Sequence, residues 1–195
     1  TELWNGSNWT EVNNLNTGRN VVAGAGISTS ALAFGGNSGS ATAVTELWNG
    51  TNWTEVNDLN TARQSLAGAG ANNTSALAFG GITPSAVTAV TETWNGTNWT
   101  EVNDLNTARE NISGAGTQTS ALGFGGYVSS PTPVTGATES WNGTNWTETA
   151  DLTTARRQMG AAGASNSSSL AFGGFAPPET AATEEFNTGV IGGSW

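Results

Sequence analysis

Residues 45–81 read TELWNGTNWTEVNDLNTARQSLAGAGANNTSALAFGG, and the rest of the chain repeats this stretch with small changes. The first aromatic residues of successive copies are 44 to 47 residues apart. Four markers recur in each copy, namely a first aromatic residue (Trp4, Trp48, Trp94, Trp141 and Phe186), a second Trp (Trp9, Trp53, Trp99 and Trp146), an Arg (Arg19, Arg63, Arg109 and Arg156) and a Gly pair (Gly35-Gly36, Gly80-Gly81, Gly125-Gly126 and Gly173-Gly174). Because this register is kept four times, the chain is a tandem repeat, and the repeat decides the fold.

Each copy predicts four short strands. Starting in the second copy, they are residues 66–70 (LAGAG), 75–79 (SALAF), 90–94 (VTETW) and 99–102 (WTEV). The third strand alternates with period two, as a half-buried strand does, and Asn95-Gly96 predicts a type I′ hairpin turn after it. No window has a sustained helical period, and 27 glycines suit a chain rich in turns.

Four short antiparallel strands per repeat of this length are typical of a β-propeller blade. The Gly pair after the second strand, the aromatic residue in the third, the Trp that opens the fourth and the Arg before the next first strand resemble the Kelch family. This resemblance covers nearly the whole chain and implies an all-β, Kelch-like propeller. Kelch repeats usually have a Tyr in the third strand and a longer gap before the Trp, whereas this chain has Trp-Asn-Gly-x-Asn-Trp. The repeats are also similar to Kelch-like tandem repeats predicted in marine phage and environmental proteins.

We expect one propeller domain over residues 1–195, with copies starting near residues 1, 45, 91 and 138 and a partial fifth copy at 183–195. The chain starts at a third strand, so the last first and second strands are expected to join the N-terminal fourth strand in one blade. Residues 1–4 or residues 183–186 would then fill the third position, and the ring would close with four blades. A five-bladed ring with an incomplete blade and an oligomer that shares blades are the alternatives. Trp195 is a further candidate for a fourth-strand Trp.

The composition excludes several classes of partner. The formal net charge is −10, and the only basic side chains are five Arg. A nucleic-acid binder or a protein that docks on an anionic membrane needs a basic surface, so neither partner is expected. No apolar run is long enough to span a bilayer, and no segment resembles a signal peptide. The absence of an initiator Met leads us to expect a processed product or an excerpt of a longer protein.

Enzyme chemistry finds few candidate residues. The chain has no His and no Cys, which removes the usual general base, the usual nucleophilic sites and ordinary zinc or copper sites. One Kelch branch is a copper oxidase, but its His and Tyr ligands cannot be assembled because Tyr127 is the only Tyr. Glu46 and Glu55 could act as paired carboxylates, yet they recur in the copies, which favours a scaffold role. No loop has a calcium-motif spacing. We therefore expect a non-enzymatic protein without metal or cofactor.

The repeated Trp and Arg residues are expected to be structural. A Trp at a fixed blade position favours packing between blades over stacking on a sugar. The Arg precedes each first strand, and Glu55, Glu101, Asp58 and Asp104 recur near it, which predicts an Arg–carboxylate brace between blades. The residues assigned to this structural set are Trp4, Trp9, Trp48, Trp53, Trp94, Trp99, Trp141, Trp146, Arg19, Arg63, Arg109 and Arg156.

The copies differ mainly in two segments. One follows the Arg (residues 20–22, 64–66, 110–112 and 157–159), and the other connects the second and third strands (residues 37–43, 82–89, 127–136 and 175–182). Both connections emerge on the same face of a propeller blade, and binding residues are usually found on loops of a rigid scaffold. The candidate ligand-binding residues are Ile82, Tyr127, Val128, Phe175, Gln64, Glu110 and Arg157. Several Pro residues stiffen the second set of loops, namely Pro84, Pro131, Pro133, Pro177 and Pro178. The alternative is neutral drift in exposed loops, with the apolar residues tucked under the rim.

Two functions follow. The first is a recognition module of a larger extracellular or virion protein, which binds a glycan or a cell-surface protein through its variable face. The second is a structural module, a rigid acidic spacer or assembly unit of a fibre, or an engineered or excerpted propeller with no ligand. The chain would be a monomer or a homo-oligomer that shares blades.

Overall fold

The computed structural model describes residues 1–129 and 133–188, so the predictions on Pro131 and Trp195 lie outside the described residues. The described residues form strands and no helices. The N-terminal hairpin contains β1 Glu2–Trp4 and β2 Trp9–Glu11. Blade 1 contains β3 Ala23–Ile27, β4 Ser30–Phe34, β5 Thr45–Trp48 and β6 Trp53–Val56. Blade 2 contains β7 Ala67–Asn72, β8 Ser75–Phe79, β9 Thr91–Trp94 and β10 Trp99–Glu101. Blade 3 contains β11 Ser113–Thr117, β12 Ser120–Phe124, β13 Thr138–Trp141 and β14 Trp146–Thr149. Blade 4 contains β15 Gly160–Ser165, β16 Ser168–Phe172 and β17 Thr183–Asn187.

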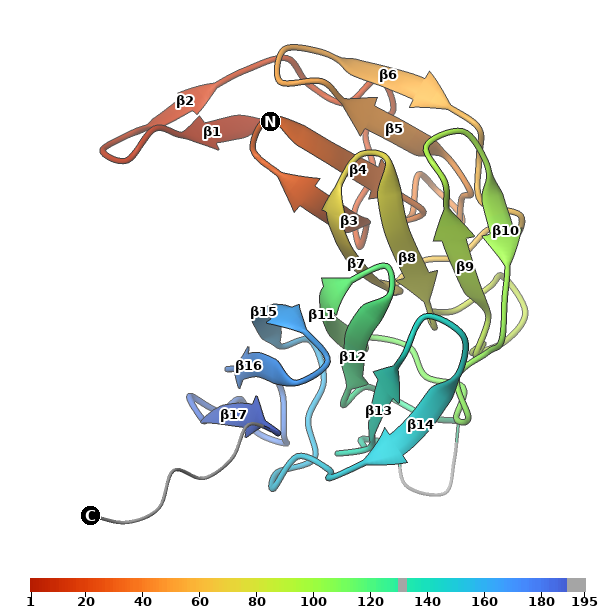
Figure 1. Ribbon diagram of the computed structural model, residues 1–195, viewed down its shortest axis with the longest axis vertical. Helices are drawn as coiled ribbons and strands as arrows, with labels where there is room; N and C mark the ends of the chain where they lie inside the picture. The colour runs from red at the N-terminus through yellow and green to blue at the C-terminus, as the bar shows by residue number, and fades with distance from the viewer. Residues whose placement is uncertain (130–132, 189–195) are drawn as a thin grey trace.

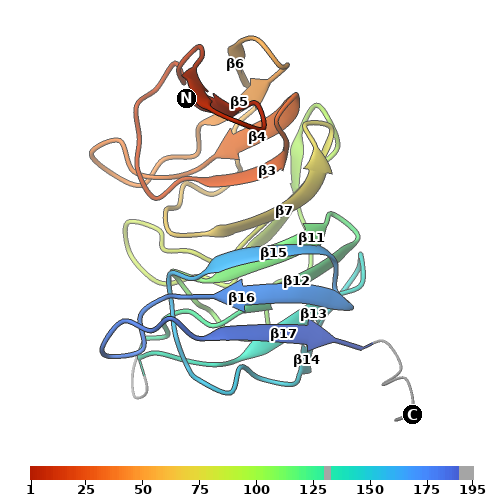
Figure 2. The same cartoon turned by 90° about the vertical axis from the view of Figure 1, so that its left-hand side faces the viewer.

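The blades are arranged in an arc, each with its first strand innermost (Figure 1). Neighbouring strands within a blade are antiparallel, and the first strands β3, β7, β11 and β15 lie side by side (Figure 2). Tiny residues permit this close approach: a Cβ on Gly68 would lie 2.6 Å from the carbonyl oxygen of Gly24 in blade 1. The prediction of an all-β propeller with four blades is confirmed.

The turn between the third and fourth strands differs from the expectation. The predicted hairpin is present, but its loop has four residues, and of Asn95 and Gly96 only Gly96 has a positive φ, +93°. The side-chain oxygen of Asn95 accepts hydrogen bonds from the backbone N–H groups of Thr97 and Asn98, both at 2.9 Å. The type I′ assignment was therefore wrong, because an Asn side chain organises the loop in place of two left-handed residues.

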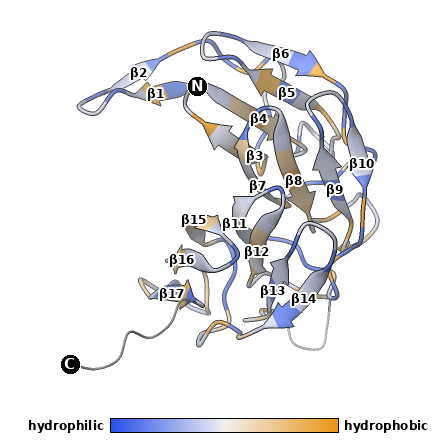
Figure 3. Cartoon of the chain, viewed as in Figure 1, coloured by the Kyte–Doolittle hydropathy of each residue, from blue (hydrophilic) through white to orange (hydrophobic). Residues whose placement is uncertain are grey.

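The core lies between successive blades. In blade 2, Leu77 and Phe79 of the second strand are completely buried, and Trp94 of the third strand is buried as well. The outer strands β6, β10 and β14 carry hydrophilic residues, whereas more apolar segments lie further inside the arc (Figure 3). Apolar side chains on the blade faces thus hold neighbouring blades together.

The expected closure of the ring by a blade shared between the two ends is not seen. Strand β17 pairs with β16 and takes the third position of blade 4. Strand β1 pairs with β2 at the opposite end of the arc, where the Trp53 side-chain N–H donates to the Thr1 hydroxyl at 3.0 Å. The N-terminal hairpin is thereby attached to blade 1, and an opening separates it from blade 4 (Figure 1).

Candidate ligand-binding face

The two variable segments of each blade meet on one face of the molecule. In blades 2, 3 and 4, an antiparallel bridge joins the residue after the repeated Arg to the first residue of the loop between the second and third strands. The bridged pairs are Gln64 with Ile82, Glu110 with Tyr127, and Arg157 with Phe175. Six of the seven candidate residues are thus brought together two by two. The seventh, Val128, follows Tyr127 and is half-buried.

A strained backbone position follows each of these pairs. The residues Val21, Ser65, Asn111 and Gln158 have φ angles of 45°, 54°, 51° and 56°, although none of them is a glycine. A left-handed conformation costs such a residue about 1–2 kcal/mol. The N–H groups of Ser65, Asn111 and Gln158 each donate to the carbonyl oxygen of the equivalent residue one blade earlier, at 3.2, 2.8 and 3.1 Å. This row of bonds crosses the arc and holds the strained residues in place.

Sequence reasoning missed this row, because the four positions hold four different residue types. A shallow depression of about 180 Å³ lies among the strained residues and the apolar residues that follow them. The only signal in the sequence was the fixed distance of each position from the repeated Arg. The row places the variable residues at constant spacing around the inner rim of this face.

Arg157 lies at the centre of the aromatic part of this face. Its guanidinium group is 5.0 Å from the ring centre of Phe175 and 5.5 Å from that of Tyr127. Glu110 lies close by, and burial raises its pKa from the ordinary value, although the positive charge of Arg157 acts in the opposite direction. The Nε of Arg157 is buried and makes no hydrogen bond within the described residues. Blades 3 and 4 therefore share one cation, two aromatic rings and one carboxyl group on the variable face.

The remaining candidates lie in similar surroundings. Ile82 is half-buried and is bridged to Val87 on the far side of its own loop. The side chain of Gln64 accepts a hydrogen bond from the side-chain amide of Asn37 in blade 1. The apolar loop residues are thus neither fully exposed nor fully tucked under the rim.

The repeated Trp residues occupy two kinds of position. The third-strand residue Trp94 donates its indole N–H to the Asn73 carbonyl of its own blade at 3.0 Å. The fourth-strand residue Trp99 packs against Phe34 of the preceding blade, with ring centres 4.9 Å apart, and donates to the Thr45 hydroxyl at 3.0 Å. Trp146 repeats these contacts one blade later. Trp4 and Trp9 of the N-terminal hairpin are exposed.

The repeated Arg residues form buried ion pairs with a different carboxylate from the ones expected. Each Arg side chain bonds within its own blade, so the predicted brace between blades was wrong. Arg63 is completely buried, and its guanidinium group lies 3.0 Å from the carboxylate of Glu92. Burial lowers the pKa of Arg63 from its ordinary value, while Glu92 acts in the opposite direction. Asp58 instead accepts a hydrogen bond from the backbone N–H of Thr45. The ion-pair partners are glutamates of the third strand, because the third strand of each blade runs past the guanidinium group. The four pairs are Arg19–Glu46, Arg63–Glu92, Arg109–Glu139 and Arg156–Glu184.

Two further observations concern the described residues as a whole. No group of three or more acidic side chains within them could hold a metal ion. No helix in the part of the chain that the structure describes is long and apolar enough to cross a membrane.

The geometry defines the chain as a β-propeller with one variable face. No protein-family model matches the sequence, and no curated protein matches it. The Kelch-type resemblance therefore rests on the residue pattern alone.

Proposed function

We propose that this chain is a non-enzymatic recognition module whose variable face binds a glycan or a surface protein. The propeller fold is consistent with a binding or scaffold role, but a fold by itself does not define a ligand. The observation that supports the proposal is the pairing of the two variable segments in blades 2, 3 and 4. The differences between copies thereby gather on one face of a constant scaffold, as expected for binding loops.

The chemistry of this face suits a polar ligand with a flat apolar side. The rings of Tyr127 and Phe175 offer surfaces on which a sugar ring or an aromatic side chain can stack. Arg157 adds a guanidinium group with several donors, directed by its contact with both rings. The other four Arg residues are held in ion pairs, so Arg157 is the Arg side chain that the described residues leave outside such a pair.

The proposal that the chain is not an enzyme is supported by the ion pairs in which the repeated carboxylates are held. Glu46, Glu92 and Glu139 are buried and bonded to Arg side chains, which favours a scaffold role for them over a role as paired catalytic acids. Their equivalent positions in successive blades also favour a scaffold role over a unique catalytic one. Kelch-type identity, and a location outside the cell or on a virion, belong to the same proposal.

The second candidate function is a structural assembly module. One observation favours it: the exposed large hydrophobic residues of the chain gather on the N-terminal hairpin, blade 1 and blade 4, which are the two ends of the arc. Both functions are compatible with an acidic chain of net charge −10.

A binding screen against glycans and host-surface proteins tests the recognition proposal. The informative variant replaces residues 37–43, 127–136 and 175–182 with the sequence of residues 82–89. Arg157→Ala and Phe175→Ala test the centre of the face, and Thr147→Ala, on the outer strand of blade 3, is the matched control.

We expect the parent and Thr147→Ala to bind a common ligand and the loop-replaced variant to lose binding while it stays folded. Binding that survives loop replacement would place the site elsewhere. A folded parent that binds nothing would favour the structural module.

A further inference from the structure

The two ends of the arc expose residues whose equivalents are buried at every internal blade boundary. Phe172 of blade 4 is 42% exposed, whereas its equivalents Phe34 and Phe79 are completely buried. At the other end, Val22 of blade 1 is 37% exposed, whereas its equivalent Leu66 is 6% exposed. Each end therefore carries one half of a blade–blade interface.

The internal boundaries show what the complete interface contains. The backbone N–H of Gly81 donates to the Arg109 carbonyl of the next blade at 2.8 Å, and a Cβ on Gly80 would lie 2.7 Å from the same oxygen. The side chain of Ile112 covers Gly80. The same contacts join Gly35-Gly36 to Arg63 and Leu66, and Gly125-Gly126 to Arg156 and Met159.

Blade 4 has the same half of this interface without its partner. Gly173 has a φ of +65°, like Gly80, but a Cβ on Gly173 would meet only the Thr180 carbonyl oxygen, at 3.8 Å. The space that Arg109 and Ile112 fill at Gly80 is thus open at Gly173. The residues equivalent to these two in blade 1 are Arg19 and Val22, at the other end of the arc.

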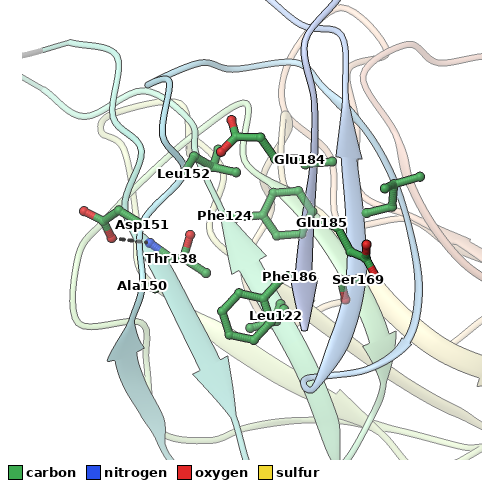
Figure 4. Close-up of a pocket in the computed structure, with 12 residues that line it drawn as sticks. Leu122, Phe124, Thr138, Ala150, Asp151, Leu152, Ser169, Glu184, Glu185 and Phe186 are labelled. Atoms are coloured by element: carbon green, nitrogen blue, oxygen red, sulfur yellow. Dashed lines mark hydrogen bonds between the residues drawn. The ribbon is translucent and has the colours of Figure 1, made fainter. Parts of the chain in front are cut away.

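A second incomplete boundary lies between blades 3 and 4. The described residues of blade 4 form three strands, and none of these strands supplies the fourth-strand Trp that fills the other boundaries. The space is a pocket bounded by Phe124, Thr138 and Phe186, among other residues (Figure 4). Phe124 and Thr138 are the equivalents of Phe34 and Thr45, which hold Trp99 at the boundary of blades 1 and 2.

None of the described residues places an indole in this pocket, whereas Trp99 and Trp146 fill the equivalent boundaries. The pocket measures about 50 Å³, and Glu184, Glu185 and Phe186 of β17 contribute to its wall. Leu122 and Leu152 complete its wall on the side of blade 3, as Leu77 and Leu105 do at the boundary that Trp146 fills. A fourth strand along β17 would cover the open side.

The N-terminal hairpin carries a strand with the matching sequence. Strand β2 begins Trp-Thr-Glu at Trp9, as the fourth strands β6, β10 and β14 begin at their own Trp residues. Trp9 is 64% exposed, whereas Trp99 and Trp146 are 5% exposed. Among the described residues, β2 is a fourth strand whose Trp is exposed, and blade 4 has room for a fourth strand beside β17.

We propose that blade 4 of one copy binds strand β2 and blade 1 of a second copy, head to tail. Strand β2 of the second copy becomes the fourth strand of blade 4, in the register Phe186 opposite Trp9, and β17 takes the place of β1. The indole of Trp9 enters the pocket and donates to the hydroxyl of Thr138. Gly174 donates to the carbonyl of Arg19.

The arc itself favours a second copy over closure within one chain. Trp99 already fills the boundary between blades 1 and 2, and Trp146 fills the boundary between blades 2 and 3. In this geometry β2 lies across the opening from blade 4 (Figure 1). Bringing both ends of one chain together would require the arrangement of the blades in this arc (Figure 1) to change, whereas a second copy can bind without such a change. The contact does not depend on the proposed ligand face.

Thiol cross-linking tests the strand register, because the chain contains no Cys. Thr10→Cys and Glu185→Cys are prepared as separate proteins, mixed, and treated with a short bismaleimide. Both positions are exposed and would lie opposite each other across β2 and β17. The control mixture pairs Thr10→Cys with Thr100→Cys, an exposed position on blade 2 that the proposal does not bring near β2.

We expect a product of twice the chain mass from the first mixture and only background from the control. If the double variant Thr10→Cys with Glu185→Cys instead cross-linked within single chains while the mixture gave no dimer, the ring would close within one chain and the proposal would be overturned. Equal cross-linking in both mixtures would also overturn it.

Sedimentation of charge variants tests the head-to-tail arrangement. Val22→Glu damages one end of the interface and Phe172→Glu the other, and both side chains are exposed in the isolated arc. Each variant alone should be a monomer at concentrations where the parent associates. A mixture of the two should form a dimer through the remaining intact pair of ends. A parent that is monomeric at all concentrations, or a mixture that stays monomeric, would contradict the proposal.

Discussion

The fold buries charged side chains, and the pair of Arg63 and Glu92 shows how they are held. Arg63 bonds to the Glu92 carboxylate and donates to the carbonyl oxygens of Gly80 and Val90. These bonds tie the segment before a first strand to the third strand of the same blade. A buried pair of this kind contributes modestly when intact, but the loss of one partner leaves an uncompensated charge in the core.

Arg63→Ala is therefore expected to lower the free energy of unfolding by about 3–5 kcal/mol, because Glu92 would remain buried without its partner. Urea unfolding followed by Trp fluorescence measures the change. Arg157→Ala is the control, since Arg157 forms no such pair and its loss should cost far less. Equal midpoints for Arg63→Ala and the parent would show that the ion pair does not stabilise the fold.

The ion pair between Arg156 and Glu184 should make the stability of blade 4 depend on pH. Burial acts to raise the pKa of Glu184, but the N–H groups of Thr153 and Thr154 and the charge of Arg156 outweigh it, so the pKa lies below its ordinary value of 4.5. A carboxyl group with a lowered pKa stabilises the fold above its unfolded-state pKa, and that stabilisation is lost as the pH falls through the folded-state value.

We accordingly expect Glu184→Gln to reduce stability at neutral pH and to flatten the loss of stability below about pH 4.5. Thermal unfolding at a series of pH values measures both effects. Glu179→Gln, an exposed change in the same blade, should leave the pH profile as in the parent. Parallel profiles for Glu184→Gln and the parent would contradict this role.

At the scale of the strand, the Gly pair after each second strand serves two purposes. Its first member adopts a left-handed φ, and its missing Cβ admits the backbone of the next blade. The two purposes can be separated, since Gly80 and Gly173 have the same φ of +65° but only Gly80 faces a neighbouring blade.

Gly173→Ala should cost about 1–2 kcal/mol from the left-handed conformation alone. Gly80→Ala should cost more, because the new Cβ would lie 2.7 Å from the Arg109 carbonyl oxygen and force the two blades apart. Urea unfolding at low protein concentration measures both, and the difference isolates the boundary. An equal loss of unfolding free energy for Gly80→Ala and Gly173→Ala would mean that the boundary between blades 2 and 3 accommodates the added methyl group without cost. At high concentration, Gly173→Ala should also weaken the proposed association.

At the scale of the whole molecule, the arc resembles a linear array more than a closed ring. Blades 2 and 3 each have a neighbour on both sides, whereas the described residues of the N-terminal hairpin contact blade 1 and those of blade 4 contact blade 3. In such arrays stability is close to a sum of unit and nearest-neighbour terms, so the ends open first.

Amide hydrogen exchange should therefore show the strongest protection in β7, β8, β11 and β12 and the weakest in β1, β2 and β17. The measurement is made at a low concentration, where copies are separate. At high concentration, protection should rise selectively in β2 and β17 if a second copy binds there. Uniform protection at low concentration would indicate a closed ring.

The sequence by itself determined the all-β propeller and most strand positions and favoured four blades, because a repeated pattern of apolar residues, Gly pairs and turn residues is local information. It also located the variable segments that the structure pairs at Glu110 with Tyr127 and Arg157 with Phe175. The identity of the Arg partner and the left-handed residues at Val21 and its equivalents were decided only by tertiary structure, because each depends on which distant backbone lies alongside. The open arc was decided at the same level: β1 and β17 are equivalent third strands, and their sequences alone cannot say which one faces a given second strand.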